Sequence, residues 1–457
     1  MKPTKTQFPQ EIPVSSNPLP LTFDSADTPA PKLALLGRLP YTVLVSNAGS
    51  GISKYGDIAI NRWRVDGTRD NYGQWCYLRD VGSGNVWSAG HQPVCADTLW
   101  YEASLAGDVA TFSRRDGEIE TRTEITVPVG GAAEVRRVTV KNLSSEKKEI
   151  ELTSYQEVVL ASTNSDRGHR AFGNLFVQTE WLAEKRTLLA MRRPRSAIHQ
   201  PVWCGHTIAV EKAVGAITVE TDRSVFVGRG RSPRNPTVMD NPGELSGTVG
   251  AVLDPVLAIR ARVAVPAGES ASVVFTTFFA KDRDDALHLA ERFKTTGTQV
   301  QPDAEVIRNS LVGVVDPDIS QDLASRLIYG TNALGRTASR ADLIAIGITG
   351  ERPILLATLS SMAATESLAD VVDLHRHWHL KGLDCDLVIV SNGSQALLDV
   401  VRDLPSSHRD DKTVYDAKGV FVLDKAGLTA KQIGALEAVA RIQIDCDRQT
   451  LDDIVNV

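Results

Sequence analysis

Residues 134–161 read EVRRVTVKN-LSSEKK-EIELTSYQEVVLA, and this stretch decides the fold class of the chain. The outer runs, 134–142 and 149–161, are rich in valine, isoleucine, leucine and threonine, whereas the middle run is polar. β-Branched runs separated by a short polar segment are typical of neighbouring antiparallel strands. The stretch therefore predicts two strands joined by a turn.

Runs of the same kind recur on both sides of this stretch, at short intervals and with turn residues between them. We therefore predict a large antiparallel β-sandwich over residues 33–280. Residues 1–32 are rich in proline, serine and threonine and are expected to form an extended lead-in or linker. The further predicted strands are YTVLVS (41–46), DIAINRWRV (57–65), QWCYLRD (74–80), NVWSA (85–89), NLFVQTE (174–180), AITVET (216–221) and SASVVFTTFFA (270–280).

The pattern changes after residue 280. Residues 281–297 have apolar side chains at helical spacing, so a helical connector is expected over 281–304. Helical patterns then alternate with short apolar runs, which predicts a small α/β domain with a mostly parallel sheet over 305–457. The expected helices are 321–334, 366–382 and 429–440, and the expected strands are 343–348, 353–359, 386–391, 419–423 and 441–445.

The bulk composition is that of a folded globular protein. The chain has 457 residues, of which 42% are hydrophobic and 23% charged, with a formal net charge of −6. Mixed charge of this kind gives no field that would attract nucleic acid. No apolar run approaches the roughly 20 residues that span a bilayer, and the N-terminus lacks a secretory pattern. We therefore expect a cytoplasmic protein with no direct membrane insertion.

The five cysteines are scattered, with no CxxC pair, which argues against a disulfide framework and a zinc site. A histidine cluster, His375, His377 and His379, has helical spacing, but no third metal ligand can be identified. We expect it to form a helix face. The glycine–arginine run Gly228–Arg231 lacks the Lys-Ser/Thr ending of a P-loop, so a solvated or aspartate-paired loop is expected. No metal and no cofactor are expected.

Many ordered motifs resemble the N-terminal β-sandwich of glycoside hydrolase family 94, and in particular its cyclic β-1,2-glucan synthase branch. The resemblance covers roughly residues 35–450. The motifs are Asn47-Ala48-Gly49-Ser50-Gly51, Arg62-Trp63-Arg64, Thr68-Arg69-Asp70, Tyr77-Leu78-Arg79-Asp80, Trp87-Ser88, His91-Gln92-Pro93, Arg115-Asp116-Gly117-Glu118, Asn174-Leu175-Phe176-Val177-Gln178, Arg192-Arg193-Pro194-Arg195 and Leu253-Asp254-Pro255.

The resemblance implies a galactose-mutarotase-like supersandwich, in an inner-membrane-associated family of glycosyltransferases and glycoside phosphorylases. In that family a downstream (α/α)6 barrel carries the general acid and the phosphate site. The chain ends at Val457, about where that barrel would begin. The expected role is therefore a non-catalytic, carbohydrate-binding or structural portion of such a protein, with β-glucan as partner. Two alternatives are a partner domain for a separately encoded barrel and a mutarotase-like isomerase that works through His91.

The segment 62–79 is predicted to form a hairpin, with Arg62 and Arg64 on one face of the first strand and Trp75, Tyr77 and Arg79 beside them on one face of the second. Aromatic faces with convergent hydrogen-bond donors are what a sugar ring needs. The segment therefore forms a candidate glucan-binding face. The alternative is that the aromatic side chains pack in the core while the arginines pair with nearby aspartates.

Three further candidates follow on the chain, namely Trp87, His91 and Gln92. His91 and Gln92 are expected on a loop at the edge of the sandwich. An imidazole there could donate to a sugar hydroxyl or exchange a proton near neutral pH. The alternative is a histidine bonded to the loop backbone.

Overall fold

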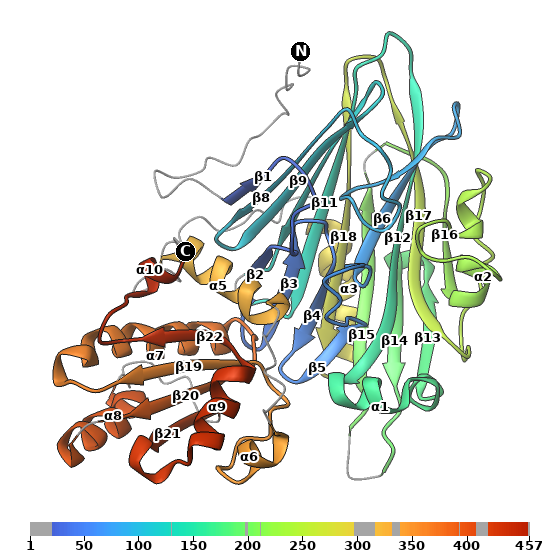
Figure 1. Cartoon of the computed structure of the whole chain (residues 1–457). Coiled ribbons are helices and arrows are strands. Elements are labelled where there is room, and N and C mark those ends of the chain that lie inside the picture. Colours follow the sequence, from blue (N-terminus) through green and yellow to red (C-terminus); the bar gives the residue numbers. More distant parts are fainter. Residues whose placement is uncertain are drawn as a thin grey trace. The chain divides into compact units, whose positions relative to one another are not determined.

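The computed structural model describes residues 21–128, 130–196, 200–210, 212–296, 316–330, 339–392, 394–407 and 419–455. The chain forms two compact units, residues 1–307 and 308–457. Unit 1 contains two large β-sheets and unit 2 a small parallel sheet with helices (Figure 1). The predicted β-rich fold with a following α/β region is confirmed.

The first sheet of unit 1 has nine described strands, each antiparallel to its neighbours. The sequence of β8 shows why this sheet forms, since buried and partly exposed side chains alternate along the strand. The strands, in spatial order, are β1 (Leu21–Phe23), β8 (Trp100–Ala106), β9 (Val109–Asp116), β10 (Ile119–Thr126), β11 (Ala133–Asn142), β18 (Ser270–Ala280), β15 (Val202–Val210), β14 (Thr187–Arg192) and β13 (Val177–Leu182).

The second sheet is centred on the long strand β12, which is buried along most of its length. One side of β12 pairs with β17, and the other pairs first with β6 and then with β5. The strands are β16 (Ala213–Asp222), β17 (Pro255–Val265), β12 (Lys148–Ser162), β5 (Ile58–Asn61), β4 (Gly51–Tyr55), β3 (Tyr41–Ser46), β2 (Leu33–Arg38), β6 (Gln74–Asp80) and β7 (Val86–Ser88).

The inner faces of the two sheets share one hydrophobic core. Strands of both sheets supply it at alternate positions, as with Ala103 and Leu105 on β8 and Leu257 and Ile259 on β17. Helices cover other parts of unit 1, and α3 packs against the first sheet through Phe293 beside Phe278. The described helices of unit 1 are α1 (Thr163–Asn174), α2 (Arg223–Val227), α3 (Arg283–Thr296), and the 3-10 turns η1 (Ala183–Lys185) and η2 (Thr237–Met239).

Two expectations for unit 1 need correction. The expected linker 1–32 already contains a strand, because Leu21 and Phe23 of β1 pack on the core while β1 pairs with β8. Residues 1–20 lie outside the described part of the chain.

The hairpin predicted over 62–79 does not form, because β5 and β6 each pair with β12 instead of with each other. Residues 297–304 of the expected connector also lie outside the described part.

Unit 2 contains a four-stranded sheet in the order β21-β20-β19-β22, and all described pairings are parallel. Its two central strands, β19 and β20, are mostly buried and apolar, as expected for a sheet covered by helices. The elements are α5 (Pro317–Tyr329), α6 (Arg340–Ile344), β19 (Ile354–Leu359), η3 (Met362–Ala364), α7 (Thr365–Leu380), β20 (Asp386–Ser391), α8 (Gln395–Ser407), β21 (Val420–Asp424), η4 (Lys425–Gly427), α9 (Ala430–Val439), β22 (Ala440–Asp445) and α10 (Leu451–Val455).

The predicted strand 343–348 is wrong. Its first residues belong to α6, whose N-cap is the side chain of Ser339, and the turn that follows contains Gly347 with a positive φ of 84°. A capped turn followed by a left-handed glycine ends a helix and cannot continue as a strand. Residues 331–334 of the predicted helix 321–334 lie outside the described residues. Among the described helices, none is long and apolar enough to cross a membrane.

Candidate functional site

The candidate glucan-binding face on β6 is covered. Trp75 and Tyr77 share a face of the strand, as alternation predicts, but their exposed fractions are 4% and 0%. They lie in a second hydrophobic cluster with Tyr155 of β12 and with side chains from residues 223–246. This segment, which includes α2 and η2, lies over the outer face of the second sheet. We call it the cover.

Hydrogen bonds hold the cover on the sheet. The Tyr77 hydroxyl donates to the carbonyl of Pro233 at 2.7 Å, and Arg79 donates to the carbonyl of Met239. From β17, Arg260 donates to the carbonyls of Val238 and Gly243 at 2.8 and 2.9 Å. Trp75, Tyr77 and Arg79 therefore pack beneath the chain's own backbone. The expectation that they form an open sugar-binding face is corrected, because the cover occupies that face.

Arg62 lies apart from these residues, in a buried ionic cluster. Its guanidinium bonds to Asp166 of α1 at 2.9 Å and to Glu157 of β12. Burial alone would lower the pKa of Arg62, but its bonds to the two carboxylates outweigh burial and raise it. Arg170 and Asp254 extend the cluster, with a separation of 2.9 Å. The cluster fixes α1 on the second sheet, which is a structural role.

Arg64 and Trp87 are also separated from each other. Arg64 is partly exposed in the segment that follows β5. Trp87 is 2% exposed in the core between the sheets, where its indole N–H donates to Thr121 at 3.2 Å. Buried indole with a satisfied donor is typical of a core residue.

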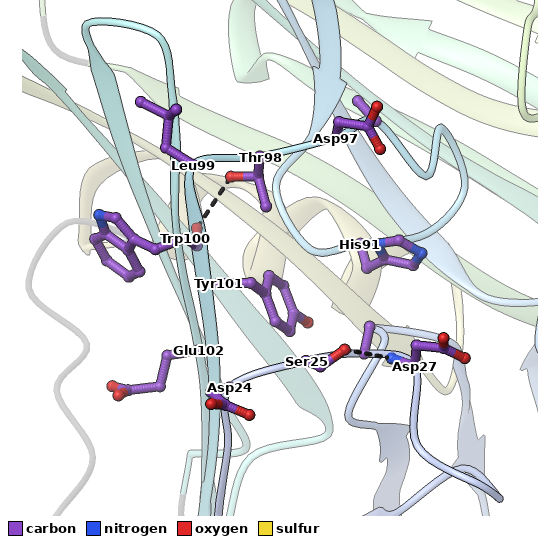
Figure 2. Close-up of a pocket in the computed structure, with 12 residues that line it drawn as sticks. Asp24, Ser25, Asp27, His91, Asp97, Thr98, Leu99, Trp100, Tyr101 and Glu102 are labelled. Carbon is purple, nitrogen blue, oxygen red and sulfur yellow. Dashed lines mark hydrogen bonds between the residues drawn. The ribbon is translucent and has the colours of Figure 1, made fainter. Parts of the chain in front are cut away.

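His91 lines an open pocket of about 610 Å³ (Figure 2). A volume of this size falls within the range of small-molecule sites, roughly 300–1,000 Å³. The pocket lies where the loop between β7 and β8 meets the residues that follow β1. It is lined by Asp24, Ser25, Ala26, Asp27, His91, Ala96, Asp97, Thr98, Leu99, Trp100, Tyr101 and Glu102.

The loop that carries His91 is tied to the sandwich from beneath. The guanidinium of Arg114, on β9, is fully buried and donates to the carbonyls of Gly90 and Ala96, at 2.6 and 3.2 Å. Asp116 fixes the same guanidinium at 2.6 Å. The backbone N–H of His91 donates to Ala48 at 3.2 Å. Support of this kind holds a binding loop in one conformation before a ligand arrives.

His91 presents a neutral imidazole to the pocket. Burial lowers its pKa, and the positive charges of Arg114 and Arg234 lower it further, against a smaller opposing effect of Asp27. The ring lies edge-on to Tyr101, with a centroid separation of 6.3 Å. A neutral imidazole has one donor and one acceptor, which suits a sugar hydroxyl. Gln92 points elsewhere, since its side-chain amide donates to the carbonyl of Arg69 at 2.8 Å.

The pocket wall combines aromatic and acidic side chains, most of which the sequence had not identified. Trp100 and Glu102 project to one side of β8 and Tyr101 to the other (Figure 2). The carboxyl group of Asp97 reaches the wall from the loop after β7. A partly exposed indole with nearby carboxylate acceptors can hold a sugar ring. None of the predicted strands contained Trp100, and no local motif set it apart from core tryptophans.

Two other sequence candidates lie elsewhere. His375 is 2% exposed on α7, and its Nε2 lies 3.1 Å from the carbonyl of Cys385. Within the described residues, no group of three or more histidine, cysteine or acidic side chains could hold a metal ion. Arg231, in the glycine–arginine run, pairs with Asp240 at 2.6 Å, as the aspartate-paired interpretation predicts.

Comparison with known proteins gives a consistent family. The family model described as glycosyl hydrolase 94, supersandwich domain, matches residues 19–296. A cyclic β-(1,2)-glucan synthase from Rhizobium meliloti is 28% identical over 380 residues, which is 78% of this chain and 13% of that protein. An N,N'-diacetylchitobiose phosphorylase from Vibrio proteolyticus is 32% identical over 145 residues, 31% of this chain and 18% of that protein.

The chain thus spans less than a fifth of the length of these two curated relatives. Solved structures are more distant. A galactose mutarotase-like protein from Clostridium acetobutylicum aligns with 53% of this chain and 93% of its own length, at 9% identity and a TM-score of 0.27.

Proposed function

Because the chain belongs to the glycosyl hydrolase 94 family through its supersandwich domain, we propose that it is the carbohydrate-binding portion of a cyclic β-1,2-glucan synthase-like protein. Its ligand in this proposal is a β-1,2-linked glucan, held in the pocket beside His91. The chain itself performs no chemistry on the glucan. Phosphorolysis or glucosyl transfer belongs to a catalytic barrel that works beside it in the cytoplasm.

The observation that carries the proposal is the pocket. A partly exposed indole, a neutral imidazole and carboxylates line a cavity of about 610 Å³. Sugars are recognised by this combination, because the ring C–H groups pack on an aromatic face while the hydroxyls bond to polar side chains. The relative with the longest alignment reported above is a glucan synthase, which favours β-1,2-glucan over other oligosaccharides.

Two features of the pocket suit binding more than catalysis. The described lining residues include no lysine or arginine, so it offers no cation for a phosphate group. His91 is kept neutral by burial and by Arg114, so little of it carries the proton that a general acid gives to a leaving group. Both features support a role in holding a neutral glucan.

Isothermal titration calorimetry with linear and cyclic β-1,2-glucans tests the proposal directly. We expect saturable heat with both ligands and weaker heat with β-1,4-linked cello-oligosaccharides. Trp100→Ala should weaken binding about tenfold, the scale of one lost aromatic contact. Phe172→Ala is the matched control, because Phe172 is an exposed aromatic residue of α1 outside the pocket.

Absence of heat with every glucan at millimolar concentration contradicts the proposal. Equal losses in the Trp100→Ala and Phe172→Ala variants would contradict the assignment of the pocket while leaving glucan binding intact.

A further inference from the structure

The C-terminal part of α1 exposes large apolar side chains at one end of unit 1. Phe172 is 55% exposed and Leu175 48%, and nearby Leu253 is 78% exposed in the loop before β17. The side chains of Asn174 and Asp254 are bonded at 2.9 Å, which brings the two segments together. We call this surface, with Phe176, Arg193 and Arg195, the α1 face. Contiguous exposed apolar groups mark interaction surfaces on soluble proteins.

Arginines frame these apolar groups. The guanidinium of Arg195 lies over the rings of Phe172 and Phe176, at 5.3 Å from each centroid, and the two rings meet edge to face at 5.2 Å. Arg192 lies over Phe176 from another direction at 5.6 Å. Burial and the like charge of Arg195 both lower the pKa of Arg192. Positive charge is therefore concentrated at this surface.

Carboxylates do not neutralise the outer arginines. Across the residues that the structure describes, no carboxylate oxygen lies within 4.0 Å of Arg193 or Arg195. The printed polar contact of Arg193 is to the carbonyl of Leu175, at 3.1 Å. A guanidinium near an aromatic ring keeps its charge, and its N–H groups fit a carboxylate with two parallel bonds.

Ion pairs and hydrogen bonds hold this surface on the second sheet. α1 is fixed on its inner side by the bond between Arg62 and Asp166, at 2.9 Å, and by Arg170 with Asp254, at 2.9 Å. Arg192 donates to the carbonyls of Gly173 and Val159, which holds the end of the helix. The apolar side chains are therefore presented in a fixed arrangement. A preorganised surface loses little conformational entropy when a partner binds.

We propose that the α1 face docks an acidic segment of a partner protein, whose carboxylates bond to Arg193 and Arg195 and whose apolar side chains pack on Phe172 and Leu253. Phenylalanine and arginine are enriched at the centres of protein interfaces. The composition of the α1 face favours a protein partner, because its cations are arginines and none of its named residues is a lysine. Arginine is enriched at protein interfaces and lysine is depleted there.

Fluorescence anisotropy with short labelled peptides tests this proposal on the intact chain. The probe alternates glutamate and leucine; a second peptide replaces glutamate by lysine, and a third replaces leucine by serine. We expect the glutamate–leucine peptide to bind, the lysine peptide not to bind, and the serine peptide to bind at least about tenfold more weakly. Raised ionic strength should weaken binding, because exposed charges are screened.

Paired variants locate the binding site. Arg193→Glu with Arg195→Glu, and separately Phe172→Ser with Leu253→Ser, should each reduce affinity about tenfold or more. Arg229→Glu is the control, since Arg229 is an exposed arginine in a different loop. Circular dichroism confirms that all variants fold. Equal affinity for the glutamate and lysine peptides, or unchanged affinity in both double variants, overturns the proposal.

Two other occupants give distinct results. Flotation with phosphatidylglycerol vesicles that is lost in the same variants, without peptide binding, overturns the protein partner in favour of a lipid surface. A dimer in sedimentation velocity that Phe172→Ser with Leu253→Ser dissociates overturns it in favour of a second copy. The expected results are a monomer and no vesicle binding. These measurements are independent of glucan binding, because the α1 face shares no residue with the pocket.

Discussion

The outer face of β6 and the pocket beside β8 hold similar side chains but differ in access. Trp75 and Tyr77 lie under the cover, with exposed fractions of 4% and 0%. Trp100 and His91 are only partly buried and line an open cavity. Strand alternation tells which side chains share a face. It does not tell whether another part of the chain lies on that face, and this decides between a core and a binding site.

The difference arises from contacts that are distant in sequence. Pro233, which accepts the hydrogen bond of Tyr77, is 156 residues further along the chain. The pocket is also built from separate segments, since Asp24 and His91 approach each other only through the pairing of β1 with β8. Neither outcome follows from a local window of sequence.

The largest expected effect is on the covered face. Tyr77→Ala should lower the free energy of unfolding by about 3–5 kcal/mol, because it leaves a cavity beneath the cover and removes the bond to Pro233. Urea denaturation followed by tryptophan fluorescence measures this. Glucan affinity per folded molecule should not change. Phe172→Ala removes only surface contacts with Phe176 and Arg195 and should lower the free energy of unfolding by about 1 kcal/mol or less. A stable Tyr77→Ala variant that has lost glucan binding would show that the outer face of β6 binds glucan and is not part of the core.

A buried histidine should make the stability of unit 1 depend on pH. His206 is fully buried, and its two ring nitrogens lie 2.9 Å from Thr277 and 2.8 Å from Ser154. Burial, with a smaller effect of Arg136, lowers its pKa to about 3. The unfolded chain takes up the proton first as pH falls, so stability is complete above about pH 6.5 and is lost toward pH 3.

Between pH 6.5 and pH 4 the loss should be about 3 kcal/mol, measured by urea denaturation at a series of pH values. Six of the seven tryptophans lie in unit 1, so their fluorescence reports mainly on the unit that contains His206. His206→Gln should be less stable at pH 7 and show a flatter pH dependence. If the stability of the wild-type protein and of His206→Gln depends on pH to the same extent, His206 is not the cause of that dependence.

The support of the pocket loop gives an intermediate effect. Arg114→Lys keeps the positive charge beside Asp116 but loses the paired bonds to Gly90 and Ala96. The free energy of unfolding should fall by about 1–2 kcal/mol, the scale of lost hydrogen bonds to a charged group. Glucan affinity should fall as well, because the loop is less ordered before binding. Arg79→Lys, beneath the cover, should lower stability without affecting affinity.

The smallest expected effect is on a pocket residue. His91→Ala should weaken glucan binding by about 1 kcal/mol, the value of one hydrogen bond, and leave the melting temperature nearly unchanged. Calorimetry at pH 7 measures the affinity. His91→Gln keeps a donor and an acceptor and should restore part of the loss. A melting temperature that falls steeply in His91→Ala would show that His91 stabilises the fold and is not primarily a ligand-binding residue.

Much of the fold could be predicted from sequence because its strands alternate cleanly. β3, β6, β11, β12 and β18 each coincide closely with a predicted run. β1 was missed because its three residues follow a proline-rich segment and show too little alternation. The 343–348 run was misassigned because its isoleucines suggested a strand, whereas Ser339 and Gly347 determine a short helix.

Less of the site could be predicted. His91 was identified as a loop residue and the structure places it in the pocket. Trp100 was missed because an aromatic residue at the start of a strand has no local sign of exposure. Asp97 was missed because it belongs to no motif. Arg62 was expected on a sugar face because its partners, Glu157 and Asp166, come about a hundred residues later. The local turns around Asp66 and Asp80 also did not indicate that residues 223–246 cover the outer face of β6.

A crystal structure of the chain with a linear β-1,2-gluco-oligosaccharide, at a concentration that calorimetry shows to be saturating, decides whether the pocket holds glucan. We expect sugar density in the pocket, with one ring packed on Trp100 and a hydroxyl of a different ring within hydrogen-bond distance of His91, while Trp75 and Tyr77 stay under the cover. Sugar density on the outer face of β6 with the cover displaced, and an empty pocket, would contradict it.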